Sequence, residues 1–285
     1  MRFLALLFLV LIPHQLSQAA PKLLCQFAPP NTMQIPAPAE GGMFSKPASG
    51  ITEKEFKKII ADVVAAYVPI AQRTGNTLVI NNLWSDATVN SDTSLDGNQW
   101  TINAYGGLAR YPGMTPDAYE MVLLHEMGHH LGGAPTYSDA SWAATEGQAD
   151  YFATMKGFRQ MFTGQGNQVS GVPATVTQKC STQLSGSDVQ LCERSSMAAL
   201  VLAKTLQQLG GEPAISFDTP DPSVVASTYE AHPAAQCRLD TYFNGSACGA
   251  SYLDSFSQTD PTVAACNSGV GARPKCWYKA PSSFL

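Results

Sequence analysis

The stretch "TPDAYEMVLLHEMGHHLGG", residues 115–133, predicts a single helix with both ends defined. Thr115 is a favoured N-cap residue, and Pro116 suits the first helical position because that position needs no backbone N–H. The pair Gly132 and Gly133 stops the helix at its other end. About four turns of helix are therefore expected here.

Two histidines of this helix lie on one face. His125 and His129 are four residues apart, so their ring nitrogens can converge on one metal ion at about 2.0–2.1 Å. Glu126 points to the adjacent side, where a carboxylate can take a proton from a metal-bound water. The pattern His-Glu-x-x-His is typical of a zinc hydrolase.

Two histidines leave a catalytic zinc one protein ligand short, and "TEGQAD" (residues 145–150) supplies a candidate. Glu146 and Asp150 are four apart and share a helix face. We expect Glu146 to ligate the metal, and Asp150 to accept the second ring N–H of a ligand histidine and so fix its tautomer. The alternative, a solvated acidic helix face, is disfavoured by the apolar residues on either side.

Three motifs together resemble a known family: "HEMGHH", "EGQAD" and "HPAAQCR". His-Glu-x-x-His followed by a helix with Glu-x-x-x-Asp resembles the zinc-binding motifs of the gluzincin metallopeptidases. The third motif, with His232, Pro233 and Arg238, narrows the resemblance to the HtpX/CaaX-prenyl-protease-like family, including its soluble exported members. The resemblance implies an α+β fold, a gluzincin-like metallopeptidase domain in which a small antiparallel sheet lies beside a mainly helical zinc-binding core.

The resemblance also implies a function: an exported, zinc-dependent endopeptidase that hydrolyses peptide bonds through a metal-bound water. One Zn²⁺ per chain is expected on His125, His129 and Glu146, with Glu126 as general base and a protein or peptide as substrate. The strand in "WTINAYGGLARYP", residues 100–112, is the expected edge for an extended substrate to pair with.

His232 and Arg238 complete the set of candidate catalytic residues. His232 either donates a hydrogen bond to the oxyanion or occupies the open zinc position as an inhibitory fourth ligand, and the sequence does not choose between these roles. Arg238 is expected to position Glu146 or the substrate carbonyl. His130 points about 100° away from His129, so we expect it to pack or hydrogen-bond and not to join the metal.

A function of another class remains open: a zinc-bearing domain that binds proteins as a quality-control or assembly factor, with little turnover. The presence of Glu126 argues against it. A purely structural metal site is less favoured, because such sites usually have four protein ligands and prefer cysteine.

The chain of 285 residues divides into four predicted parts. Residues 1–20 have the pattern of a signal peptide, and 21–50 form a Pro/Gly-rich extended arm that is not expected to pack. Residues 51–250 are the metallopeptidase domain, and 251–285 a turn-rich segment held by disulfides. Export predicts a periplasmic or extracellular protein, and no later stretch suits a transmembrane segment. The net charge of −5 without a basic run disfavours nucleic acid as a partner.

Further elements follow from periodicity and turn residues. A capping box at Thr52 and Glu55 begins a helix that continues to Gly75. Residues 77–112 predict a small antiparallel sheet with a hairpin at Asp96–Gly97. Later helices are expected at 138–162 with Ser138 or Ser141 as cap, at 195–211, and from Pro233 onward.

Seven cysteines suit an oxidising compartment. None forms a Cys-x-x-Cys pair, so disulfides are a better interpretation than a structural zinc site. Six of them allow 15 pairings, of which the near-neighbour set 180–192, 237–248 and 266–276 is the first guess, with Cys25 left over. Cys25 as a lipid-anchor site is disfavoured by the Leu24 before it.

Overall fold

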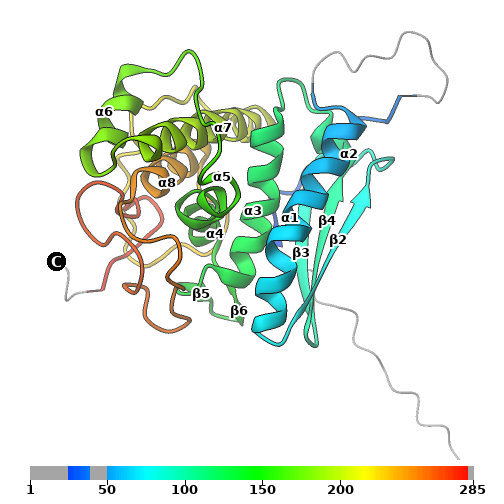
Figure 1. Ribbon diagram of the computed structural model, residues 1–285, viewed down its shortest axis with the longest axis horizontal. Coiled ribbons are helices and arrows are strands. Elements are labelled where there is room, and N and C mark those ends of the chain that lie inside the picture. The colour runs from blue at the N-terminus through cyan, green and yellow to red at the C-terminus, as the bar shows by residue number, and fades with distance from the viewer. Residues whose placement is uncertain (1–24, 39–49, 282–285) are drawn as a thin grey trace, which may run out of the picture.

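The computed structural model describes residues 25–38 and 50–281, and the predicted signal peptide lies outside them. Figure 1 shows α3 between two groups of elements, with α1 and the larger sheet on one side and the later helices on the other. The elements, in chain order, are β1 (Cys25–Gln26), α1 (Glu53–Arg73), β2 (Thr77–Leu83), β3 (Ser91–Asp96), β4 (Gln99–Tyr105), α2 (Gly106–Ala109), α3 (Pro116–Leu131), β5 (Thr136–Tyr137), β6 (Ala140–Ala144), α4 (Glu146–Phe152), a π-helical turn η1 (Ala153–Phe158), α5 (Arg159–Phe162), α6 (Ala174–Gln183), α7 (Ser187–Gly210) and α8 (Ala235–Ala247).

The predicted capping box begins α1 as expected. The Glu55 N–H donates to the Thr52 hydroxyl at 3.2 Å, and the Thr52 N–H donates to the Glu55 carboxylate at 2.7 Å. Phe56, Val63 and Tyr67 are seven and four residues apart, so their side chains share one face of α1. This buried face packs α1 on α3 and β2. This apolar stripe is what fixes α1 over the sheet.

The larger sheet is small, as predicted, but it is mixed and not antiparallel. Its order is β1-β3-β4-β2, and β3 and β4 form the predicted hairpin, with Gly97 at φ +57° in the turn. β2 pairs with β4 in parallel, because residues 84–90 carry the chain past β4 before β3 begins. β4 therefore has neighbours on both sides, and the expectation that its stretch offers a free edge to substrate is wrong.

The free side of β3 is taken by the N-terminal part of the chain. Cys25 pairs with Thr93 and Gln26 with Asp92, antiparallel to β3. Cys25, Phe27 and Ala28 are fully buried, so the expectation of an unpacked arm is wrong for these residues. Backbone pairing with β3 and the apolar Phe27 side chain outweigh the Pro/Gly-rich composition that follows. The part of the arm at 39–49 lies outside the described residues.

The decisive helix has the ends that the sequence predicts. The Thr115 hydroxyl accepts from the Ala118 N–H at 3.3 Å, and Gly132 and Gly133 end the helix, the latter at φ +65°. Residues 118–130 are all buried, because α1, β3, β6, α4 and α7 surround α3. The helix that carries the His-Glu-x-x-His motif therefore lies at the centre of the hydrophobic core.

The next helix begins later than expected. Residues 138 and 141 do not cap it, because Ala140–Ala144 form β6 and pair with β5 in a small hairpin. The helix starts at Glu146, with Thr145 in the N-cap position. This places Glu146 in the first turn and leaves the backbone of Ala144 extended beside α3.

α3 and α4 cross in direct backbone contact at Gly128. A Cβ atom at this position would lie only 2.8 Å from the Cα and carbonyl oxygen of Ala149. Any larger residue would push α4 away. Gly128 therefore sets how closely the helix that carries Glu146 approaches the histidine face of α3.

The remaining helices differ from expectation in their starts. α7 begins at Ser187, eight residues before the predicted 195, and α8 begins at Ala235 and not at Pro233. α6 was not predicted from the sequence. No helix in residues 25–38 and 50–281 is long and apolar enough to cross a membrane.

Three disulfides hold the C-terminal half, which fits a chain that folds in an oxidising compartment. The pair Cys180–Cys192 is as predicted, whereas the other four cysteines form Cys237–Cys276 and Cys248–Cys266. The guess 237–248 is wrong for a geometric reason. These positions lie at opposite ends of α8, roughly 16 Å apart at 1.5 Å per residue, whereas a disulfide needs Cα atoms within about 7 Å.

Candidate metal centre

The two histidines of the motif face each other. Nε2 of His125 lies 3.2 Å from Nε2 of His129. On the far side of each ring, His125 Nδ1 donates to an Asp150 carboxylate oxygen at 2.7 Å, and His129 Nδ1 donates to the Ala144 carbonyl at 2.8 Å. Because both acceptors require a proton on Nδ1, each ring in its neutral form turns an Nε2 lone pair toward the same point.

Such an arrangement suits a cation between the rings. Two lone pairs 3.2 Å apart repel unless a proton or a metal ion lies between them. Ligands at 2.0–2.1 Å in a tetrahedral zinc site have donor atoms about 3.3–3.4 Å apart. The His125–His129 separation matches that spacing, and the positions of their Nδ1 partners match those found behind zinc-bound histidines.

Glu146 adds a third donor to the same point. Its two carboxylate oxygens lie 3.3 Å from His125 Nε2 and 3.7 Å from His129 Nε2. Tyr137 donates its hydroxyl to Oε1 at 2.9 Å, while Oε2 is buried without a hydrogen-bond partner. A buried carboxylate oxygen without a hydrogen-bond partner, beside two imidazole lone pairs, forms a group of donors that could hold a metal ion.

Charge on these groups follows from burial and from their neighbours. Burial lowers the pKa of His129 to about 4, so this ring is neutral. Burial would also lower the pKa of His125, but Asp150 and Glu146 outweigh it and raise the value to about 9. A metal ion at this point would therefore compete with a proton for His125 Nε2, and its affinity would fall in acid.

Asp150 is held by Arg238. The guanidinium donates from Nε and Nη2 to the two carboxylate oxygens, each at 2.7 Å, and both side chains are essentially inaccessible to solvent. Burial would raise the pKa of Asp150, but Arg238 and His125 outweigh it and lower the pKa. Asp150 thus remains an anion that can fix the tautomer of His125.

Glu126 is the group without a role in holding the others. Its side chain is fully buried, and neither carboxylate oxygen has a hydrogen-bond partner. Burial raises its pKa well above the usual range, His125 opposes this, and repulsion from Glu146 adds to it. Because an unpaired buried carboxylate is costly, its retention next to the two histidines calls for a functional explanation.

His232 lies at this site, as the sequence suggested, but its hydrogen-bond partner, the Gln26 carbonyl, was not predicted. Its Nε2 is 3.4 Å from Glu146 Oε2 and donates to the carbonyl oxygen of Gln26 at 2.5 Å. Arg238 differs from expectation in a similar way. It positions Asp150 and not Glu146, and its Nη1 donates to the Phe27 carbonyl at 2.6 Å.

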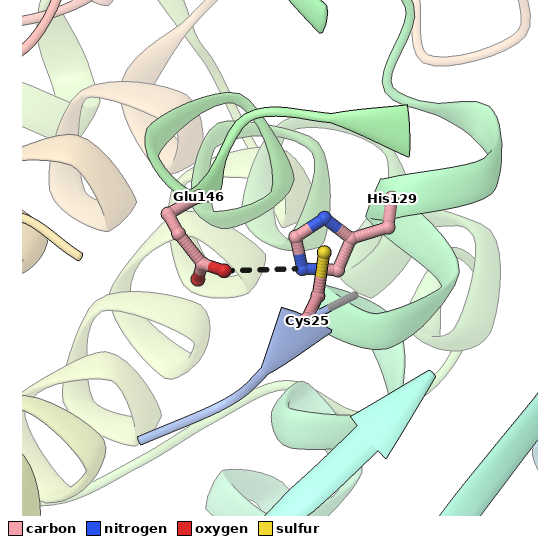
Figure 2. A group of neighbouring side chains, drawn as sticks. All are labelled: Cys25, His129 and Glu146. Atoms are coloured by element: carbon pink, nitrogen blue, oxygen red, sulfur yellow. Dashed lines mark ion pairs between the residues drawn. The ribbon is translucent and has the colours of Figure 1, made fainter. Parts of the chain in front are cut away.

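The thiol of Cys25 belongs to the same cluster, which the sequence analysis missed. Potential ligand atoms of Cys25, His129 and Glu146 all lie within 4.8 Å of one another. Figure 2 shows the thiol of β1 projecting toward the His129 ring and the Glu146 carboxylate. Its leftover status among seven cysteines was the only signal in the sequence. Nothing in the spacing of Tyr137 or Ala144 marked them as partners of the centre.

His130 has the packing role expected of it. Its ring stacks between Trp100 and Trp142, at centroid distances of 4.8 and 5.1 Å, and Nε2 lies 2.8 Å from the Thr93 hydroxyl. The ring also borders a cavity of about 540 Å³ that is lined by α1, η1 and residues 252–258. That cavity contains none of the four residues His125, Glu126, His129 and Glu146, so we place the chemistry at the buried cluster and not there.

Comparison with known protein families, with curated proteins and with solved structures gave no match. The family resemblance therefore rests on the three motifs and on the arrangement of their side chains.

Proposed function

We propose that this protein is a zinc-dependent endopeptidase of the gluzincin type, in which His125, His129 and Glu146 hold one Zn²⁺. The observation that carries the proposal is that the Nε2 atoms of the two histidines and the carboxylate oxygens of Glu146 converge on one point, at mutual distances of 3.2–3.7 Å. Beside them lies a buried Glu126 whose carboxylate oxygens have no hydrogen-bond partner. The resemblance to the HtpX/CaaX-prenyl-protease-like family points the same way.

Zinc held by His125, His129 and Glu146 would supply Lewis acidity and would lower the pKa of a water bound to it to about 7. Glu126 takes the proton of the attacking water and passes it to the leaving amine. Burial raises the pKa of Glu126, which favours its holding the proton between the two transfers.

Asp150 and Arg238 support the chemistry by orienting the His125 ring. Arg238 holds Asp150, and Asp150 holds the His125 ring with its Nε2 toward the metal. His232, once its N–H is free of the Gln26 carbonyl, can donate to the oxyanion that develops on a substrate carbonyl.

The test measures metal and hydrolysis separately. Purified protein is analysed for zinc by elemental mass spectrometry and assayed on an unfolded protein substrate. We expect one zinc per chain in the wild type and in Glu126→Gln, most of it lost in His129→Ala, and hydrolysis lowered by about 10²–10⁴ in Glu126→Gln.

Glu120→Gln is the matched control for Glu126→Gln. Glu120 is a second buried glutamate of α3, and none of the residues that dominate its electrostatics belongs to the metal cluster. The same substitution there should change neither zinc content nor hydrolysis. Full zinc in His129→Ala, or equal hydrolysis in Glu126→Gln and wild type, would overturn the proposal.

A further inference from the structure

A short segment of the N-terminus covers the metal centre. This segment, residues 25–28, is called the strap below. It pairs with the open side of β3, and the Phe27 N–H donates to the Ser91 carbonyl at 2.9 Å. Asn90 brackets Ala28 through two further hydrogen bonds, of 2.9 and 3.1 Å. The strap is thus bound as a β-strand on the edge that an extended peptide would use.

Residues assigned to the catalytic site bind the strap as well. His232 donates to the Gln26 carbonyl, and Arg238 donates to the Phe27 carbonyl. The Phe27 ring meets the His125 ring edge-on at a centroid distance of 5.4 Å. With the strap in place, the His232 N–H is engaged by a backbone carbonyl, as it would be by a substrate carbonyl.

The Cys25 side chain brings a metal ligand to the remaining position. Cys25 is fully buried, and its sulfur lies within 4.8 Å of ligand atoms of His129 and Glu146. It is the one unpaired cysteine among the described residues, in a chain whose other six are oxidised to disulfides. Thiolate is a preferred ligand of zinc, and the two imidazoles and one carboxylate leave one tetrahedral position open.

We propose that Cys25 is the fourth ligand of the metal, and that the strap occupies the place of an extended substrate and suppresses most of the hydrolysis by the peptidase until it is displaced. The proposal rests on the proposed function for its inhibitory part only. On ligation the thiol loses its proton to solvent, and on displacement the sulfur regains one. Water then takes the fourth position, and a substrate strand pairs with β3.

Glu126 distinguishes this arrangement from a structural zinc site. A structural site needs four ligands and no more, and Cys25 with the other three residues would satisfy it. The Glu126 carboxyl, a fifth group buried beside the four ligands without a hydrogen-bond partner, adds only cost to such a site. It is explained if the fourth ligand leaves and Glu126 then meets a water.

The first test reads the ligand directly. Zinc K-edge X-ray absorption of the full-length protein should detect one sulfur at about 2.3 Å with lighter donors at about 2.0–2.1 Å. Cys25→Ser should retain zinc and lose the sulfur signal. The control Met33→Ala replaces an exposed side chain in the same N-terminal stretch and should retain both the zinc and the sulfur signal. A wild-type spectrum without sulfur overturns ligation by Cys25, whereas a wild-type protein without zinc overturns the proposed function instead.

The second test reads inhibition. Cys25→Ser should hydrolyse an unfolded protein about tenfold faster than wild type or more, and Cys25→Ser with Glu126→Gln should not. Asn90→Ala loosens the strap and leaves the thiol intact, so it should raise both hydrolysis and the reaction rate of Cys25 with a maleimide. It also decides the matter if Cys25→Ser fails to fold. Unchanged hydrolysis in zinc-loaded Asn90→Ala whose thiol reacts faster overturns the inhibitory role.

Discussion

Replacing Asp150 by Asn separates what this residue does for folding from what it does for the metal. The carboxylate receives three hydrogen bonds of 2.7 Å, one from His125 and two from Arg238, and both Asp150 and Arg238 are at most 1% exposed. Asn keeps the shape but carries no charge, and it turns an NH₂ group toward one of these donors.

The expected cost follows from burial. Removing one partner of a buried ion pair leaves a buried charge and costs about 3–5 kcal/mol. Because Asn retains one acceptor, we expect the lower end, about 3 kcal/mol, or a melting temperature lowered by about 6–12 °C for a domain of this size. Zinc affinity should fall by about 10–100-fold, because His125 loses the acceptor that fixes its tautomer.

Asp117→Asn provides a matched control. Arg194 grips Asp117 with the same two bonds, from Nε and Nη2, each of 2.7 Å, but these side chains are 17% and 29% exposed. A pair within reach of solvent contributes about 1 kcal/mol or less, so this variant should lose about 1 kcal/mol and no zinc affinity.

Urea unfolding of the metal-free proteins measures the first quantity, and competition with a chromophoric zinc chelator measures the second. Equal destabilisation by the two Asn variants would refute the argument from burial. Unchanged zinc affinity in Asp150→Asn would refute its role in orienting His125, whatever the unfolding data show.

Three further predictions concern other parts of the fold. Burial, with repulsion from Asp117 and Asp62, raises the pKa of Glu120 from 4.5 to about 8, so the unfolded carboxyl ionises at lower pH than the folded one. The free energy of unfolding should therefore fall by on the order of 5 kcal/mol as pH rises from about 4.5 to 8, and Glu120→Gln should flatten this slope in unfolding curves. Gly128→Ala should lower zinc affinity by about tenfold or more and should lower the free energy of unfolding by about 1–3 kcal/mol, because the added Cβ meets the Ala149 backbone. In the control Gly157→Ala, the added Cβ meets only the Leu124 side chain at 3.1 Å, so a zinc titration should give the wild-type affinity. Peptide mapping without reduction should recover the disulfides 180–192, 237–276 and 248–266. Replacing both Cys237 and Cys276 by Ser should lower the free energy of unfolding by about 4 kcal/mol, against about 3 kcal/mol for Cys180 and Cys192, because the first disulfide closes a loop of 39 residues and the second a loop of 12.

What the sequence predicted well was local. The capping box of α1, the ends of α3 and the hairpin at Gly97 each depend on residues within a few positions of one another. The placement of His125, His129, Glu146 and Asp150 also follows from helical spacing, once two helices are assumed to cross.

What it missed depends on pairing between distant segments. Whether β2 joins β3 or β4 is decided by the path of residues 84–90, and nothing in their composition specifies it. The strap reaches the centre because β3 has an unpaired side, a fact that no local pattern encodes. The pairing of Cys237 with Cys248 was wrong because the helix predicted for residues 232–243 continues to Ala247 in the structure, and this added turn keeps the two cysteines apart.

The contact between Trp277 and Gly147 links the centre to the oxidation of the chain. A Cβ on Gly147 would lie 2.2 Å from the Trp277 ring, so the indole rests directly on the turn of α4 that carries Glu146. The neighbouring Cys276 is bonded to Cys237, one residue before Arg238 on α8. A single covalent bond thus ties the support of Glu146 to the support of Asp150. Before that bond forms, neither the indole nor α8 is tethered to the other, so reduction of this one disulfide should loosen the supports of Glu146 and of Asp150 together.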